Sequence, residues 1–290
     1  MVLGAIPLIE LGVWRPEVFG LSIPVDPWAT LVCIGFVAGL EVARNRAIKM
    51  GLDVRDVVDG AVFIVLMGFL VGHIVTVVAY HPERLAEEPI MAILRVWEGF
   101  SSFGGFLGAV IGSALFYNVV RKRPAWRHID TIAFGFPVGW FFGRVGCGVV
   151  HDHVGAPTDF PLGMYFPKGH WAAQEAAMVR HELGLYEAAF MIPVIALFLY
   201  LGRRDRVPGF FAGLFAVLYA PVRFFLDFLR NTDLSGADAR YAGLTPAQYG
   251  ALVMLIAGIA LLATRDYKGF EPHPLDGSRG PEPDTGPEGG

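Results

Sequence analysis

The chain has 290 residues, of which 54% are hydrophobic and only 17% are charged. This apolar content exceeds what one soluble core needs, so the composition indicates a polytopic membrane protein. The formal net charge of -4 comes partly from an acidic C-terminal tail, and we find no basic stripe that would indicate a nucleic-acid partner. Cys33 and Cys147 have neither CxxC nor zinc-site spacing, so they predict no disulfide framework.

Seven apolar segments are predicted to span a membrane as helices. They cover residues 27–41, 57–80, 103–120, 129–150, 186–201, 209–229 and 247–264. We therefore predict an all-α polytopic membrane protein with seven transmembrane helices; the alternative is six helices after a re-entrant first segment. Residues 1–268 would form one transmembrane domain. Residues 269–290, rich in proline, glycine and acid, are predicted to be a disordered tail.

Lysine and arginine predict the orientation of these helices, because they are enriched in cytoplasmic loops. They cluster after the first, third, fifth and seventh helices, at Arg44, Arg46, Lys49 and Arg55, at Arg121, Lys122, Arg123 and Arg127, at Arg203, Arg204 and Arg206, and at Arg265 and Lys268. The N-terminus is thus predicted outside and the C-terminus in the cytoplasm. Segment 151–185, with several prolines and charges, would form an arm or small head on the outer side.

Two arginines stand inside apolar helices, Arg144 in the fourth and Arg223 in the sixth. Such a charge costs about 2.5–3.5 kcal/mol on insertion scales, so it usually faces a cavity, pairs with a carboxylate or binds an anion. A guanidinium suits bidentate contact with phosphate. Two arginines with only one obvious carboxylate, Asp227, leave a positive excess, so we expect the two arginines to converge on one anionic lipid headgroup. The alternative is structural, with Arg223 neutralised by Asp227 and Arg144 snorkelling to the outer headgroups.

Helical spacing extends each arginine into a polar stripe. On the fourth helix the predicted stripe is Arg144, Cys147 and His151, and on the sixth it is Tyr219, Arg223, Asp227 and Arg230. Gly104 and Gly105, at the start of the third helix, either present backbone N–H groups to an anion or let two helices pack closely. At the entry to the fifth helix, His181, Tyr186 and Glu187 either orient groups in the site or anchor that helix at the interface.

The motifs WEGFSSFGG, GRVGC, RHELGLYE and Tyr219-x3-Arg223-x3-Asp227-x2-Arg230 resemble, in the same order, those of the bacterial prolipoprotein diacylglyceryl transferase family. The resemblance covers nearly the whole seven-helix chain. It implies an inner-membrane enzyme, without a cofactor, that transfers diacylglyceryl from phosphatidylglycerol to the lipobox cysteine of a prolipoprotein. Glycerol phosphate would leave and a thioether would form. The implied substrate-binding residues are Arg144, Arg223, Arg230, Gly104, Gly105 and His181. Asp227 matches a family glutamate and Tyr219 a family tyrosine, and both are expected to be catalytic.

The chain departs from the family pattern where protons are handled. The family's GRxGNFxNxE motif reads GRVGCGVVHDH, and the histidine of its HGG motif, a proposed base, is Phe103 here. His73 and Ala29 replace a family arginine and tyrosine. Attack by a thiol on a glyceryl carbon needs a base, so we expect His151 to replace the lost one, with His153 second. Cys147 is either an acceptor nucleophile or an inert core residue.

Two functions of other classes stay open. One is a metal-dependent membrane lipid hydrolase or transferase, with zinc on residues drawn from His151, Asp152, His153, His181 and His170. Residues at i and i+2 do not share a helix face, so such a cluster requires a loop. The other is a non-catalytic lipid-binding relative. The sequence leaves the acceptor and the oligomeric state open.

Overall fold

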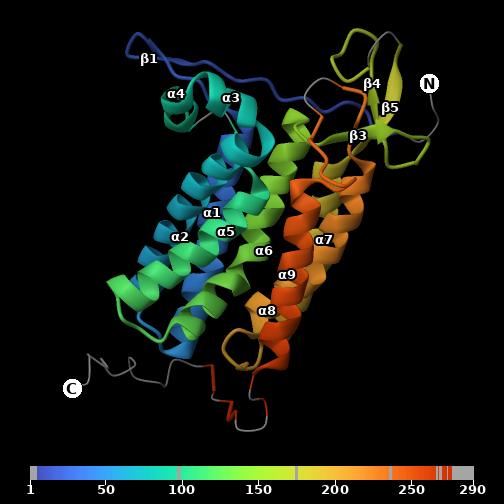
Figure 1. Ribbon diagram of the computed structural model, residues 1–290. Coiled ribbons are helices and arrows are strands. Elements are labelled where there is room, and N and C mark those ends of the chain that lie inside the picture. Colours follow the sequence, from blue (N-terminus) through green and yellow to red (C-terminus); the bar gives the residue numbers. More distant parts are fainter. Residues whose placement is uncertain are drawn as a thin grey trace. The chain divides into compact units, whose positions relative to one another are not determined.

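The computed structural model describes residues 5–96, 99–173, 176–234 and 237–265, together with positions 267, 270–272, 274 and 275. Most of the predicted tail lies outside the described residues, as do Trp97 and Glu98 of the WEGF motif. The chain divides into two compact units, whose elements are labelled in Figure 1. The first unit comprises the chain up to Gly39, Pro137–Leu197 and Val222–Asp238, and the second comprises Leu40–Phe136, Phe198–Pro221 and the chain from Ala239.

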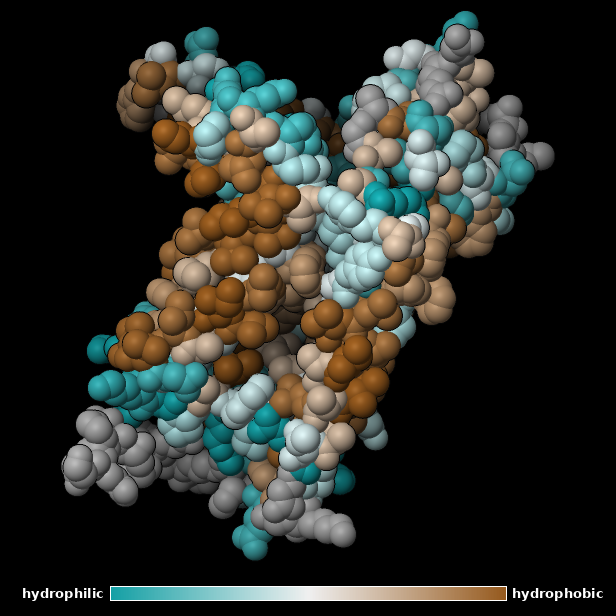
Figure 2. All heavy atoms as spheres, viewed as in Figure 1, coloured by the Kyte–Doolittle hydropathy of each residue, from teal (hydrophilic) through white to brown (hydrophobic). Residues whose placement is uncertain are grey.

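Within the described residues, seven helical segments are long and apolar enough to cross a membrane, which confirms the predicted number. They are α1 (Pro27–Met50), α2 (Val54–Val75) with a π-helical end (Thr76–Tyr80), α5 (Ser102–Ala114) with a π-helical end (Leu115–Val120), α6 (Ala125–Val150), α7 (Leu183–Leu201), α8 (Phe210–Leu226) with a 3₁₀ turn (Asp227–Leu229) and α9 (Pro246–Ala263). Figure 2 shows hydrophobic side chains gathered over the sides of these helices, as lipid contact requires.

The first helix is longer than predicted. The sequence predicts an end near Glu41, but α1 continues to Met50. The added turns mix polar with apolar residues, and Ala43, Ala47 and Met50 on them are buried in a hydrophobic cluster. Glu41 also pairs with Arg44 at i and i+3, with 2.7 Å between Glu41 Oε2 and Arg44 Nε. Arg46 is buried and its guanidinium carbon lies 4.4 Å from the centre of a phenylalanine ring. Arg44 and Arg46, which were predicted in a loop, therefore lie on the helix.

Close packing of α2 against α5 is a main feature of the second unit, and Figure 1 shows the two helices side by side. Glycines remove side chains from the contact. A Cβ at Gly108 would lie 2.8 Å from the Cα of Gly68, and one at Gly104 would lie 2.8 Å from the Cα of Gly72. This is the small-residue pattern of helix pairs in membranes. The short helices α3 (Pro82–Glu87) and α4 (Pro89–Leu94) join α2 to α5.

The first unit contains a three-stranded antiparallel sheet in the segment predicted as an arm or head. Its strands are β3 (Val154–Pro157), β4 (Met164–Phe166) and β5 (Met178–Glu182), in the order β3-β5-β4, and a separate two-stranded hairpin is formed by β1 (Glu17–Val18) and β2 (Leu21–Ser22). The all-α prediction lacks these strands. α6 runs into β3 through a three-residue turn, and β5 runs directly into α7. The sheet thus fixes both the turn and the start of α7.

Arg180 ties the sheet to the chain after α8, within the first unit. This side chain is fully buried on β5, and its guanidinium forms a bidentate ion pair with Asp233. It also donates to the backbone oxygens of Ala172 and Gly155. The hydrogen bond from Arg180 holds the pKa of Asp233 below its usual range. A buried arginine with these partners is a structural residue.

Candidate functional site

The turn between α6 and β3 separates the two candidate base histidines. α6 ends at Val150, and His151 follows with φ = +57°, a left-handed conformation that redirects the chain. The predicted common face of Arg144 and His151 is therefore wrong, because helical spacing no longer applies past the helix end. His151 Nδ1 instead lies 3.0 Å from Glu182 Oε2, and both side chains are almost fully buried.

His153, rather than His151, lies beside Arg144. The distance from Arg144 NH1 to His153 Nε2 is 3.1 Å. Cys147 shares the helix face of Arg144 as predicted, with 3.9 Å between Arg144 NH1 and the thiol sulfur. The guanidinium carbon also lies 4.5 Å from the ring centre of Trp140, one turn earlier on α6. The side chain of Arg144 is only 4% exposed, so within the first unit it is an interior group.

The two arginines of the site converge on one carboxylate, that of Glu187 on α7. Arg144 Nε lies 3.0 Å from Glu187 Oε2, and Arg223 NH1 lies 3.1 Å from Glu187 Oε1. Arg223 also pairs with Asp227, at 2.9 Å between NH2 and Oδ1. The expected positive excess is wrong, because two arginines meet two carboxylates and the four formal charges cancel. Isolated charges buried to this degree would each cost several kcal/mol, which explains the matched set.

Glu187 is the member of this set whose pairing with both arginines was not predicted from sequence. It was named there only with His181 and Tyr186, as a residue that either orients groups in the site or anchors the fifth predicted helix. The available signal was the same one that identified Arg144: a charged residue after the first turn of an otherwise apolar helix. Its side chain is fully buried. If every charged residue within an apolar helix is considered, acidic as well as basic, Glu187 is identified as a carboxylate partner for the arginines.

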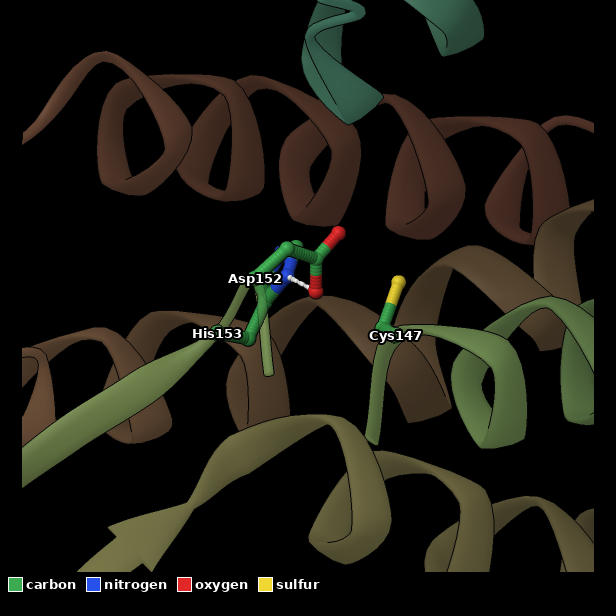
Figure 3. Close-up of side chains that lie close together, drawn as sticks. All are labelled: Cys147, Asp152 and His153. Carbon is green, nitrogen blue, oxygen red and sulfur yellow. Dashed lines mark hydrogen bonds and ion pairs between the residues drawn. The ribbon is translucent and has the colours of Figure 1, made fainter. Parts of the chain in front are cut away.

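His153, Asp152 and Cys147 form a second cluster next to Arg144. Figure 3 shows the imidazole of His153 against the carboxylate of Asp152, with the thiol of Cys147 directed to the same side. Arginine is a donor only, so His153 Nε2 accepts from Arg144, and Nδ1 carries the proton that it donates to Asp152. The imidazole is therefore neutral and held in one tautomer. The ligand atoms of the cluster, one each from Cys147, Asp152 and His153, lie within 4.8 Å of one another.

Burial lowers the pKa of His153, and the positive charges of Arg230 and Arg144 lower it further. The carboxylate of Asp152 acts in the opposite direction without cancelling these effects. The imidazole is consequently neutral near pH 7 and well suited to accept a proton.

The other sequence-predicted residues of the first unit have their hydrogen-bond partners outside these two clusters. Within the first unit, Arg230 pairs with Asp238 at 2.7 Å, and His181 Nδ1 lies 3.1 Å from the hydroxyl of Tyr186. His170 Nδ1 accepts from the backbone N–H of Ala172. The predicted metal set was His151, Asp152, His153, His181 and His170. Of these, only Asp152 and His153 belong, together with Cys147, to the group of ligand atoms that lies within 4.8 Å in the described part of the chain, while the rings of His151 and His170 lie 6.1 Å apart.

Three predicted residues belong to the second unit. Tyr219 is buried and its ring stacks on Phe215, with 5.2 Å between centroids. The N–H of Gly104 donates to the hydroxyl of Ser101, and the N–H of Gly105 donates to the carbonyl of Ser101. The two N–H groups expected to face an anion are thus engaged in the helix cap, and close packing on α2 accounts for Gly104.

Comparison with known proteins gives one consistent match. A family model described as prolipoprotein diacylglyceryl transferase matches residues 16–264. The phosphatidylglycerol–prolipoprotein diacylglyceryl transferase of Nitratidesulfovibrio vulgaris strain Miyazaki F is 32% identical over 258 residues, covering 85% of this chain and 94% of that protein. The proteins of the same name from Chromohalobacter salexigens and Nitrosomonas europaea are 31% and 30% identical; they match 85% and 86% of this chain and 92% and 90% of their own lengths.

Proposed function

The chain belongs to the prolipoprotein diacylglyceryl transferase family, as its motifs predict, and we propose that it transfers diacylglyceryl from phosphatidylglycerol to a prolipoprotein cysteine. The two substrates are those named for its relatives. The observation that carries the proposal for this site is the convergence of Arg144 and Arg223 on the single carboxylate of Glu187.

The converging guanidinium groups support binding of the phosphoglycerol headgroup. A phosphodiester presents anionic oxygens in much the same way as a carboxylate, and arginine binds both in bidentate fashion. The phosphate would sit beside or in place of Glu187, between Arg144 and Arg223. Asp227 then holds Arg223 in position through its 2.9 Å ion pair. In this proposal Glu187 keeps the two cations together when no lipid is bound.

The chemistry needs a base for the thiol, a site for the leaving phosphate and no cofactor. His153 Nε2 takes the proton from the acceptor cysteine, and the thiolate sulfur attacks the glyceryl carbon that bears the phosphate. The carbon–oxygen bond breaks and a thioether forms. Glycerol phosphate leaves with the bonding electron pair, stabilised by the two arginines, and then takes the proton back from His153. His153 replaces His151 as the first candidate because it lies beside Arg144.

We also propose where this reaction takes place. The arginine and lysine distribution supports an inner-membrane protein with its N-terminus outside and its C-terminus in the cytoplasm. Residues 1–268 would form the transmembrane domain, 151–185 an outer-side head and 269–290 a cytoplasmic tail. The turn with His153 then lies on the outer side, where the lipobox cysteine of a prolipoprotein would meet it.

The test measures phosphatidylglycerol binding and diacylglyceryl transfer to a lipobox peptide by purified protein. Arg144→Met and Arg223→Met should each lose most binding and transfer, because each removes one of the two cations. Arg44→Met is the matched control, since Arg44 is 41% exposed and pairs only at the polar end of α1; it should behave as wild type. Equal binding by all three variants would refute the headgroup site. Binding without transfer would instead indicate the non-catalytic relative.

A metal-dependent lipid hydrolase is the second candidate, because Cys147, Asp152 and His153 offer sulfur, oxygen and nitrogen donors in close proximity. The cation of Arg144, 3.1 Å from His153 Nε2, disfavours a metal at that nitrogen. Metal analysis of the purified protein and transfer before and after chelation separate the two candidates. Bound zinc together with activity lost on chelation and restored by zinc would favour the hydrolase.

A further inference from the structure

Both ring nitrogens of His153 are engaged in hydrogen bonds. Nδ1–H donates to Asp152, and the lone pair of Nε2 accepts from Arg144. A general base must present a lone pair within hydrogen-bond reach of the proton that it abstracts. His153 therefore has the right tautomer and a lowered pKa, but its basic nitrogen is covered by a cation. Arg144 acts as a mask on this nitrogen.

Arg144, which covers Nε2 of His153, is also the residue that faces the proposed headgroup. Arg144 reaches Glu187 through Nε at 3.0 Å and His153 through NH1 at 3.1 Å, so one planar group links the two clusters. A hydrogen bond from a guanidinium to phosphate is about twice as strong as one between neutral groups, and its bidentate form fixes the plane of the guanidinium. A phosphate that binds Arg144 in this way competes directly with the neutral imidazole.

We propose that an anionic phosphate headgroup draws Arg144 away from His153 and thereby exposes the base. Asp152 is the positioning residue, because its bond to Nδ1–H keeps the exposed lone pair on Nε2. This inference rests on the proposed function, and it names how the site is regulated. The acceptor thiol is activated when a donor lipid is in place, so the two substrates are coupled through one guanidinium.

The charged groups around His153 are consistent with such a switch. Asp152 favours the protonated ring, whereas Arg144 and Arg230 oppose it. Withdrawal of Arg144 removes one of the two opposing cations, so the exposed imidazole is also a stronger base. Arg230 stays paired with Asp238 and does not contribute to the change. Binding of the headgroup thus acts on both the access and the basicity of Nε2.

The experiment measures reaction of His153 with diethyl pyrocarbonate, which modifies neutral accessible imidazoles, by peptide mass spectrometry. Full-length protein is placed in nanodiscs of phosphatidylcholine or of phosphatidylglycerol. We expect the rate at His153 to rise about tenfold with phosphatidylglycerol, equivalent to about 1.4 kcal/mol of preference for phosphate. His81, whose side chain is 36% exposed, is the internal reference and should react equally in both lipids.

Two variants keep the test decisive. Arg144→Met should give fast modification of His153 in both lipids, and its thermal unfolding shows whether the fold is kept. Asp152→Asn should shift the acid limb of the modification profile to lower pH, because the carboxylate that favours the protonated ring is gone, and Asp152→Glu should restore it. Equal modification of wild-type His153 in the two lipids overturns the inference, even if transfer to a lipobox peptide occurs. Absence of transfer, with lipid-dependent modification intact, refutes the proposed function alone.

Discussion

Replacement of Glu187 by glutamine tests the charge balance of the site. Glu187→Gln keeps the shape of the side chain but changes the sum of the four formal charges from zero to one positive charge. Arg144 and Arg223 are only 4% and 7% exposed, so water cannot compensate. Removal of one partner from a buried ion pair costs about 3–5 kcal/mol. At about 2–4 °C per kcal/mol, the lower figure corresponds to a loss of about 6–12 °C in the unfolding midpoint.

The decrease in the unfolding midpoint of Glu187→Gln should also depend on the lipid that is present. Without Glu187 the two arginines have one carboxylate fewer, so an anionic phosphate restores the balance. In detergent, added phosphatidylglycerol should therefore restore part of the lost unfolding temperature of Glu187→Gln, whereas added phosphatidylcholine should not. Glu41→Gln is the control, because Glu41 is 51% exposed and its ion pair is worth at most about 1 kcal/mol. A variant as stable as wild type, or one rescued equally by both lipids, would refute the reasoning.

Three further predictions concern the base and the helix packing. His153→Gln should lower the initial rate of transfer about 10²–10⁴-fold as expected for a lost general base, whereas a folded His151→Gln variant should keep most activity; the reverse order would restore His151 as the base. In the lipid-free site the pKa of His153 lies below its ordinary value of 6.5, so the acid limb of kcat/KM, which reports the free enzyme, should lie below pH 6.5; an acid limb of kcat/KM above pH 6.5 would contradict this assignment. Gly108→Leu should destabilise the second unit strongly, because a Cβ there already lies 2.8 Å from Gly68, and unchanged thermal unfolding would contradict the close contact.

The helices were predictable from sequence because long apolar runs have few alternatives in a membrane. The end of α1 was not, since the burial of Ala43, Ala47 and Met50 extends the helix beyond its continuous apolar run. The small sheet was also missed. Its strands are short, β4 having three residues, and they carry no alternation long enough to detect.

The candidate site was predicted in part for related reasons. Two arginines in apolar helices predicted a shared lipid headgroup, which stays a prediction; in the structure both of them pair with the carboxylate of Glu187. The choice between His151 and His153 depended on where α6 ends and on the positive φ of His151. Helical spacing does not apply beyond Val150, so only the structure shows which of the two histidines lies nearest to Arg144.

Diacylglyceryl transfer at this site is tested most directly by mass spectrometry of a lipobox peptide incubated with purified protein in phosphatidylglycerol nanodiscs. We expect a diacylglyceryl thioether on the peptide cysteine, equimolar release of glycerol phosphate, and loss of both products in Arg144→Met and His153→Gln. No thioether from a folded wild-type protein that binds phosphatidylglycerol, or undiminished thioether from both variants, would refute the proposed transfer.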